Sequence, residues 1–407
     1  MSRLLVDLTP LRTNRNFRLL FSGQFVSLLG SNLTLVAVPY QVYLATHSSL
    51  WVGLTSLLQL PFLIAGSLWG GAFGDRFDRR ALLILSALVL TFVSAGLGLN
   101  ARATHPSLAG LLALAALAAG VGGFAGPLRS SAVPSLVAPE ELVAAYSLFQ
   151  VIVNMAAVVG PSVAGVLLAG LGLASCYFID AATFLALMIA TFFMAPIPPA
   201  KEATGTKLLA AIANGFRYVR QHATAKAVYL VDLNANVFGL PRALYPAVAL
   251  SVYHGGPRVL GLLYAAPGVG ALVMAVFTGW IARVQRRGRL VLLVVIGWGL
   301  AMTLFGAVTI IWVGLVCLAL AGAADVISTV LRNTMLQNAI TDEFRSRVSS
   351  IQLAVVTGGP RLGDLESGAV ANFTSTSFSI ISGGLACVAG VLILIRRYPH
   401  FWRSAEL

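Results

Sequence analysis

Charged residues are scarce in this sequence of 407 residues, and their scarcity excludes most soluble folds. Only 10% of the side chains are charged, whereas a soluble domain carries about 25% because its surface faces water. Hydrophobic residues make up 58% of the chain. Such a composition cannot cover a water-facing surface, so much of the outer surface must face lipid.

Residues that serve metal, nucleotide or covalent chemistry are also few. The three cysteines lie within apolar runs, where buried thiols are expected rather than disulfides or metal ligands. The five histidines fall at or outside the ends of the expected helices, which leaves metal-dependent or nucleophilic catalysis without its residues. The sequence contains no G-x-x-x-x-G-K-[ST] motif, so an ATP-driven pump is excluded. We therefore expect no enzyme, no metal and no cofactor.

Long apolar runs dominate instead. A transmembrane helix needs about 20 apolar residues, and about twelve such runs occur, six before residue 196 and six after residue 226. The expected seventh and eleventh spans are 227–252 and 348–372. The sequence predicts an all-α membrane protein. Its predicted parts are an N-terminal six-helix half at 1–195, a cytoplasmic linker with an amphipathic helix at 196–226 and a C-terminal six-helix half at 227–407.

The net charge of +13 is spread over short basic clusters between the apolar runs, which suits membrane topology better than nucleic-acid binding. Nearly all of these clusters fall in loops on one side, and the opposite loops hold only Arg102 and Arg258. Basic loops stay in the cytoplasm. We therefore expect a multi-pass protein of a bacterial cytoplasmic membrane with both termini inside.

The two halves repeat one another in outline. The segment Leu128-Arg129-Ser130-Ser131 recurs as Leu331-Arg332-Asn333-Thr334, about 200 residues later. Two similar halves in the same orientation are typical of transporters that rock around a site near the membrane midplane. A channel or a membrane enzyme has no need of this layout.

One loop carries a specific signature. After the second expected helix the sequence reads Gly71-Ala72-Phe73-Gly74-Asp75-Arg76-Phe77-Asp78-Arg79-Arg80. This segment resembles the G-x-x-x-D-R-x-x-R-R motif of the major facilitator superfamily, in the loop where that family carries it. The resemblance implies the major facilitator fold of two parallel six-helix halves. It also implies a gating motif in which the acidic residue braces the facing half and the arginines form a charge relay. The implied gating residues are Gly71, Asp75, Arg76, Arg79 and Arg80.

The fifth expected helix carries a second motif, Gly160-Pro161-Ser162-Val163-Ala164-Gly165. It resembles the G-P-x-x-x-G centre of a motif in antiporters and drug exporters of the superfamily, which singles out Gly160, Pro161 and Gly165. Ala156 stands where a glycine usually precedes this centre. A packing kink without directional meaning is the alternative interpretation.

Nearly the whole chain also resembles the superfamily's group of bacterial enterobactin (siderophore) exporters and drug exporters. One segment that carries this resemblance is Arg242-Ala243-Leu244-Tyr245-Pro246-Ala247. The resemblance implies proton-driven export of a siderophore or a related amphiphile.

Ionisable residues inside expected helices are functional candidates, because a charge at the bilayer centre costs about 2.5–3.5 kcal/mol. In the eleventh helix, Arg361, Asp364 and Glu366 lie beside glycines and a proline that we expect to interrupt the helix at midspan, a pointer to a binding site. Arg361 and Asp364 share one face and can pair. A carboxyl whose burial and partner change can bind and release a proton. Asp364 is the first candidate proton carrier, Asp325 the second, and Arg361 the modulating cation.

Further polar residues complete the candidate site. Asp232 joins the proton-coupling candidates, with a structural ion pair as the alternative for it and for Asp325. Asp180, near the outer end of the sixth helix, is expected in an ion pair or a helix cap. Polar stripes at helical spacing predict a substrate cavity, although such stripes also join helices to one another. The candidate cavity residues are Gln24, Ser31, Gln41, Gln150, Asn154, Asn236, Arg242 and Arg332.

The sequence as a whole predicts a proton-coupled exporter, an antiporter, of a small amphiphilic molecule such as a siderophore or a drug. We expect a monomer whose partners are its substrate, protons and the bilayer. An importer or uniporter on the same fold and a non-transporting membrane receptor stay open. Coupled proton movement separates the antiporter from the uniporter, and absence of any flux would favour the receptor.

Overall fold

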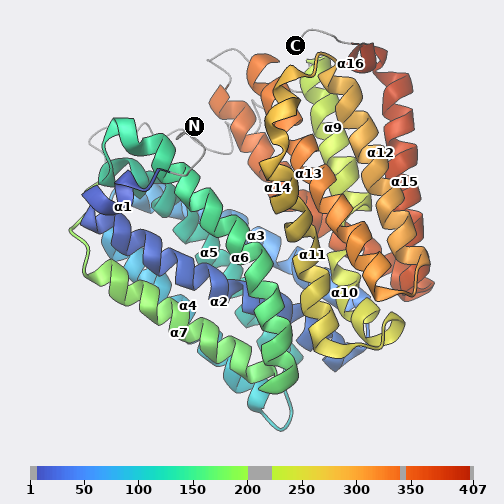
Figure 1. The fold of residues 1–407 in the computed structure, drawn as a ribbon. Helices are drawn as coiled ribbons and strands as arrows, with labels where there is room; N and C mark the ends of the chain where they lie inside the picture. The colour runs from blue at the N-terminus through green and yellow to red at the C-terminus, as the bar shows by residue number, and fades with distance from the viewer. Residues whose placement is uncertain (1–6, 200–221, 340–344, 404–407) are drawn as a thin grey trace. The chain divides into compact units, whose positions relative to one another are not determined.

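The computed structural model describes residues 7–199, 222–339 and 345–403, which form helices and loops without a strand (Figure 1). Ten helices in this part are long and apolar enough to cross a membrane. The chain divides into two compact units, which we call unit 1 (Met1–Thr46 and Leu58–Gly205) and unit 2 (His47–Leu57 and Thr206–Leu407). The protein is therefore an all-α, multi-pass membrane protein.

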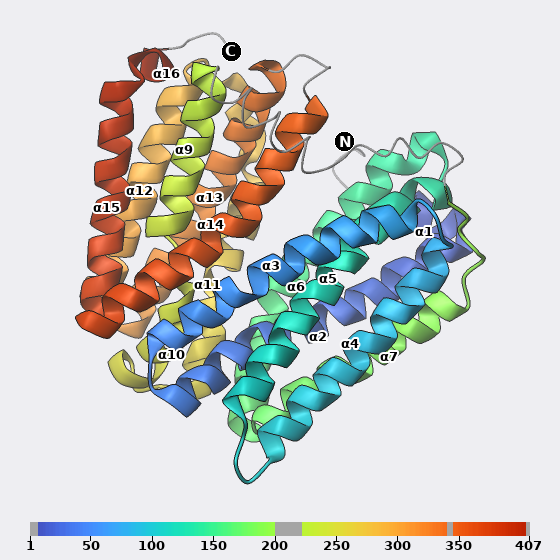
Figure 2. The same cartoon turned by 180° about the vertical axis from the view of Figure 1, so that it is seen from behind.

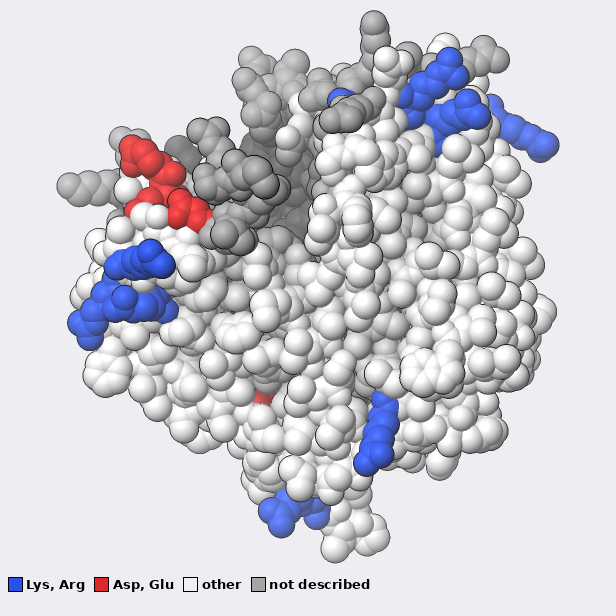
Figure 3. Space-filling view, in the orientation of Figure 1, with Lys and Arg blue, Asp and Glu red and all other residues white. Residues whose placement is uncertain are grey.

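The outer surface agrees with a lipid environment. The face in Figure 3 is covered mostly by uncharged side chains, with Lys and Arg near its margins. Large apolar side chains such as Trp69, Phe92 and Val276 are exposed, which would be unfavourable in water and is favourable against hydrocarbon.

Unit 1 contains the first six long helices of the chain. In this unit α7 packs against α2 and α4, α2 against α6, and α4 against α5. Figure 2 shows α4 and α7 side by side. The elements are α1 (Thr9–Thr13), α2 (Arg15–Thr46), α3 (Ser49–Gly74), α4 (Arg79–Arg102), α5 (Leu108–Leu136), η1 (Pro139–Glu141), α6 (Leu142–Gly170) and α7 (Leu173–Phe192). The first turns of α3, within His47–Leu57, group with unit 2.

The C-terminal part of unit 2 begins with a broken helix. Its elements are α9 (Ala223–Phe238), η2 (Arg242–Leu244), α10 (Tyr245–Ala247), the π-helical η3 (Val248–Val252), α11 (Gly256–Val276), η4 (Thr278–Arg283), α12 (Arg287–Ala307), α13 (Ile311–Ala339), α14 (Arg345–Phe373), α15 (Thr376–Arg397) and α16 (Pro399–Arg403).

The helix pairs of unit 2 match those of unit 1. The pairs α12–α15, α12–α13 and α9–α14 repeat α4–α7, α4–α5 and α2–α6 in chain order, and Figure 2 shows α12 and α15 side by side. The prediction of two similar six-helix halves is confirmed. The boundaries 1–195, 196–226 and 227–407 stay predictions, and the amphipathic helix expected in the linker lies outside the described residues.

Glycines bring helix backbones into direct contact at equivalent places. A Cβ added to Gly66 of α3 would collide with the carbonyl oxygen of Gly120 on α5. A Cβ added to Gly270 of α11 would collide with the carbonyl oxygen of Ala319 on α13. Small residues allow such close approach in membranes, where packing rather than the hydrophobic effect holds helices together.

The interruption expected in the eleventh helix is found in the seventh, so that prediction was wrong. Helix α14 continues through Pro360, whereas α9 ends at Phe238 and is followed by Pro241, which has no N–H to continue the helix. The glycines of α14 serve packing instead. A Cβ on Gly363 would collide with the carbonyl oxygen of Asn236 on α9.

Candidate functional site

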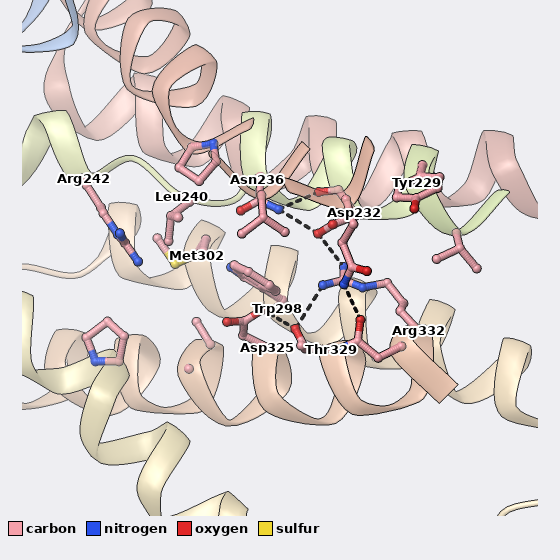
Figure 4. A pocket seen from close by; sticks show the side chains of 18 of the residues that line it. Tyr229, Asp232, Asn236, Leu240, Arg242, Trp298, Met302, Asp325, Thr329 and Arg332 are labelled. Carbon is pink, nitrogen blue, oxygen red and sulfur yellow. Dashed lines mark hydrogen bonds and ion pairs between the residues drawn. The ribbon is translucent and has the colours of Figure 1, made fainter. Parts of the chain in front are cut away.

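A cavity of about 380 Å³ lies within unit 2, lined by residues from α9 to α14. This volume falls in the range of about 300–1,000 Å³ that small-molecule sites occupy. The cavity combines aromatic and polar side chains (Figure 4). The aromatic residues are Tyr229, Tyr245 and Trp298, and the charged ones are Asp232, Arg242, Asp325 and Arg332.

An ion pair joins two walls of this cavity. Nη1 of Arg332 on α13 lies 2.9 Å from Oδ1 of Asp232 on α9, and the two side chains are 7% and 9% exposed. The N–H groups on Nη1 do not point at an acceptor, so the contact is an ion pair rather than a hydrogen bond. Asn236, one turn along α9, donates from Nδ2 to Asp232 Oδ1 at 2.8 Å and to its backbone carbonyl at 2.9 Å. Asp232 is thus held by two side chains.

The ion pair continues into a polar chain along α13. Nη2 of Arg332 donates to Thr329 Oγ1 at 3.1 Å, and that hydroxyl donates to Asp325 Oδ1 at 3.3 Å. Asp325 is exposed to the cavity. Figure 4 shows Thr329 and Asp232 both facing the guanidinium of Arg332. Asp325 is therefore linked to Asp232 through two intervening side chains.

Asp364 lies where three segments of unit 2 meet. Its Oδ2 accepts a hydrogen bond from Ser56 Oγ of α3 at 2.6 Å, and its Oδ1 accepts one from the backbone N–H of Ala243 at 3.0 Å. The helix break at Pro241 leaves such an N–H without a helical acceptor. Gly53 lets α3 approach, since a Cβ there would collide with the carbonyl oxygen of Asp364.

The expected pairing of Arg361 with Asp364 is not found. Arg361 Nη1 donates to the carbonyl of Thr357 at 2.8 Å, and no ion pair with Asp364 occurs among the residues that the structure describes. The guanidinium of Arg361 binds a backbone carbonyl of its own helix instead, and Asp364 is held by Ser56 and by the N–H of Ala243. Glu366 is partly buried on the same helix, and Arg242 is exposed in η2.

The gating motif of unit 1 divides into buried and exposed members. Asp75 and Arg76 are exposed, whereas Arg79 is buried. Arg79 donates to the carbonyls of Gly74 and Ser131, each at 3.3 Å. It therefore links the end of α3 to α5.

Arg80 binds the end of α7. It donates to the carbonyl of Thr191 at 3.3 Å and to that of Phe192, and its guanidinium lies 5.6 Å from the Phe192 ring centroid. A cation at a helix C-terminus interacts favourably with the unpaired carbonyls there. Gly71 has open space around its Cα, since an added Cβ would meet nothing within 4 Å.

The predicted cavity residues of unit 1 lie in different surroundings. Gln24 and Gln41 are buried, and Gln41 Oε1 accepts a hydrogen bond from the Tyr177 hydroxyl at 2.8 Å. Gln150 is exposed and donates to Asn154 at 3.1 Å on the same helix. Ser31 is partly buried. Their contact with a substrate stays a prediction.

The antiporter-like motif lies within a continuous helix. Pro161 and Gly165 are buried in α6. A Cβ on Gly160 would collide with Asn32 Cβ of α2. The motif therefore allows close packing of α6 on α2, and its directional meaning stays a prediction.

Asp180 was expected near a helix end in an ion pair or a cap, and this was wrong. It is only 1% exposed on α7, and its Oδ2 accepts hydrogen bonds from Thr34 at 2.6 Å and Ser94 at 2.9 Å. The sequence signal was an acidic residue in an otherwise apolar helix.

Known structures share this fold. A nucleoside transporter NupG matches with a TM-score of 0.76 at 12% sequence identity, over 94% of this chain and 99% of that one. A POT family transporter in complex with 5-aminolevulinic acid matches with a TM-score of 0.75 at 12% identity, over 95% and 97%. With its two repeated six-helix units, the chain has the fold of these transporters, the major facilitator fold.

Sequence comparison gives the family within that class. Residues 6–406 match the transmembrane secretion effector family, and the chain belongs to it. It is 32% identical over 398 residues to the enterobactin exporter EntS of Citrobacter koseri, and 33% identical over 399 residues to that of Salmonella typhi. Both matches cover 96% of this chain and 94% of the relative.

Proposed function

We propose that this chain is a proton-coupled exporter, an antiporter, that carries a small amphiphilic molecule such as a siderophore out of a bacterial cell by alternating access. The polar chain from Asp325 through Arg332 to Asp232, lining a partly aromatic cavity, carries the proposal. We further propose that the protein works as a monomer with both termini in the cytoplasm.

The cavity chemistry supports an aromatic substrate with hydroxyl groups. Arg242 provides an exposed cation, and Tyr245 and Trp298 form part of the wall. A catechol ring can pack against this partly aromatic wall while its hydroxyls donate to Asp325. Because a protonated Asp325 would accept such hydrogen bonds less well, proton and substrate would compete, as antiport requires. The relatives named as enterobactin exporters support the same substrate class.

Asp364 is the proposed principal proton carrier. It lies beside the cavity and holds the N–H of Ala243, the residue that follows the cavity-lining Arg242. Protonation would weaken its charge-assisted hydrogen bonds and free η2 to move, which would displace Arg242. Asp325 and Asp232 are the further candidates in this unit, and Arg361 modulates the charge of Asp364.

Everted membrane vesicles with an acidic interior and a pH-sensitive dye test the proposal. A catecholate siderophore and then a lipophilic cationic drug are added to the wild type, to Asp364→Asn and to Glu140→Gln, which removes an exposed carboxyl of η1. We expect proton release on siderophore addition with the wild type and Glu140→Gln, and no release with Asp364→Asn.

The other outcomes have distinct meanings. Equal release by all three proteins would make Asp364 structural and direct attention to Asp325 and Asp232. If no protein releases protons while labelled substrate still equilibrates, the chain is a uniporter. If nothing moves at all, a receptor function replaces transport.

A further inference from the structure

A buried carboxyl of unit 1 takes no part in the mechanism proposed above. Asp180 lies inside the packed helices α2, α4 and α7, with 1% of its surface exposed. Thr34 of α2 and Ser94 of α4 donate to its Oδ2 at 2.6 and 2.9 Å. Its Oδ1 is buried and has no hydrogen-bond partner among the described residues.

Among the residues that the structure describes, no cation forms an ion pair with Asp180. The basic residues of the surrounding helices are found only at their ends, and α6 carries none. The other titratable groups of these helices are thiols and phenols. The basic residues are Arg15, Arg18, Arg79, Arg80 and Arg102, and the thiols and phenols are those of Tyr40, Tyr43, Tyr146, Cys176 and Tyr177. An isolated carboxylate in such surroundings is very unfavourable, and a buried carboxyl takes up a proton instead.

The hydrogen-bond pattern fits a neutral acid. A carboxylate accepts at both oxygens, whereas a protonated carboxyl accepts at its carbonyl oxygen and donates from the other. Both donors go to Oδ2, which leaves Oδ1 as the oxygen that carries the hydrogen.

A hydroxyl oxygen lies on the same side of Asp180 as Oδ1. Thr183 Oγ1, which itself donates to the Asp180 backbone carbonyl at 2.7 Å, faces the same point of α2 as Asp180 Oδ1. A Cβ added to Gly30 would collide with Thr183 Oγ1 and lie 2.8 Å from Oδ1. The hydroxyl oxygen keeps a lone pair for the proton of the acid.

We propose that Asp180 is a second proton-binding site, located in unit 1, which is occupied in this conformation and releases its proton during the transport cycle. The ligand is a proton rather than a sodium ion, because Thr34 and Ser94 touch Oδ2 directly and Gly30 closes the side of Oδ1. The release step rests on the proposed exporter function, and the protonation itself does not.

Infrared spectroscopy of the purified full chain in lipid tests the site without any substrate. A protonated carboxyl gives a carbonyl stretch that a carboxylate lacks. We expect such a band in the wild type and in Asp364→Asn, and its loss in Asp180→Asn. Ser94→Ala, which removes one hydrogen bond to Oδ2, should shift the band to higher frequency. An identical band in Asp180→Asn, or no shift in Ser94→Ala, would overturn the proposal.

Two further arms separate this proposal from its rivals. If sodium ions change the carboxyl spectrum of the wild type and not that of Asp180→Asn, the site binds a cation and the proton proposal fails. The release step is tested by the pH profile of transport, which should be flatter in Asp180→Asn than in the wild type, and an unchanged profile contradicts it. Absence of antiport would remove the exporter function and leave the band in place.

Discussion

Arg332 and Asp232 are partners that the sequence places far apart and the fold brings to 2.9 Å. Each is almost fully shielded, and each has one further side-chain partner, Thr329 for the arginine and Asn236 for the aspartate. Because both charges are buried, the pair matters most when one member is removed. The remaining charge then has no counter-ion in a medium that solvates it poorly.

Asp232→Asn should therefore destabilise the protein by about 3–5 kcal/mol, the cost of leaving one member of a buried pair alone. The double variant Asp232→Asn with Arg332→Gln should recover much of that loss, since no charge remains. Thermal unfolding of the wild type, Asp232→Asn, Arg332→Gln and the double variant in detergent gives the double-mutant cycle. Additive effects of the two changes would show that the residues do not interact.

Ser56→Ala removes the hydroxyl that donates to Asp364. A hydrogen bond to a charged group contributes about 1.5–3 kcal/mol, so the melting temperature should fall. Ser56→Thr keeps the hydroxyl and should retain most of the stability. Equal melting temperatures for Ser56→Ala and the wild type would rule out a stabilising role for this bond.

Two adjacent glycines of α5 provide a matched test of helix packing. A Cβ on Gly123 would collide with the carbonyl oxygen of Leu63, whereas one on Gly122 would meet nothing within 4 Å. Gly123→Ala should lower stability by about 1–3 kcal/mol through overpacking. Gly122→Ala should raise it by about 0.5–1 kcal/mol, because alanine is the better helix residue. Thermal unfolding compares the stabilities of the two variants. A Gly123→Ala variant more stable than Gly122→Ala would contradict the packing described for α3 and α5.

The arginines of the gating motif should contribute differently to stability, according to how deeply each is buried. Arg80→Ala removes donors to two carbonyls at the end of α7 and should cost about 1.5–3 kcal/mol. Arg76→Ala changes an exposed side chain and should stay within about 0.5 kcal/mol of the wild type. Chemical unfolding of both variants measures the two losses of unfolding free energy. A larger loss for Arg76→Ala would be incompatible with the contacts of unit 1.

The sequence was sufficient to predict the class of fold. The apolar runs and the repeat of Leu128-Arg129 as Leu331-Arg332 depend only on local composition and spacing, which are properties of the sequence itself. Asp232, Asp325, Asn236 and Arg332 could be selected because charged and amide side chains are rare in apolar helices.

The contacts between those residues could not be predicted. The Asp232–Arg332 pair depends on how α9 and α13 are rotated about their axes, which hydrophobic periodicity fixes poorly in helices that are apolar on all sides. The break was assigned to Pro360 rather than Pro241 for a related reason. A proline interrupts a helix or is tolerated according to whether neighbours accept the freed backbone groups, and at Ala243 the acceptor is the distant Asp364.

The most direct test of the central claim uses purified protein in proteoliposomes, with an imposed pH gradient as the only energy source. The lumen is made acidic, and a labelled catecholate siderophore is supplied outside at neutral pH. Proton-coupled export predicts accumulation of the siderophore inside above its external concentration, abolished by a protonophore. Entry that stops at equal concentrations on both sides, with or without the gradient, would contradict the account.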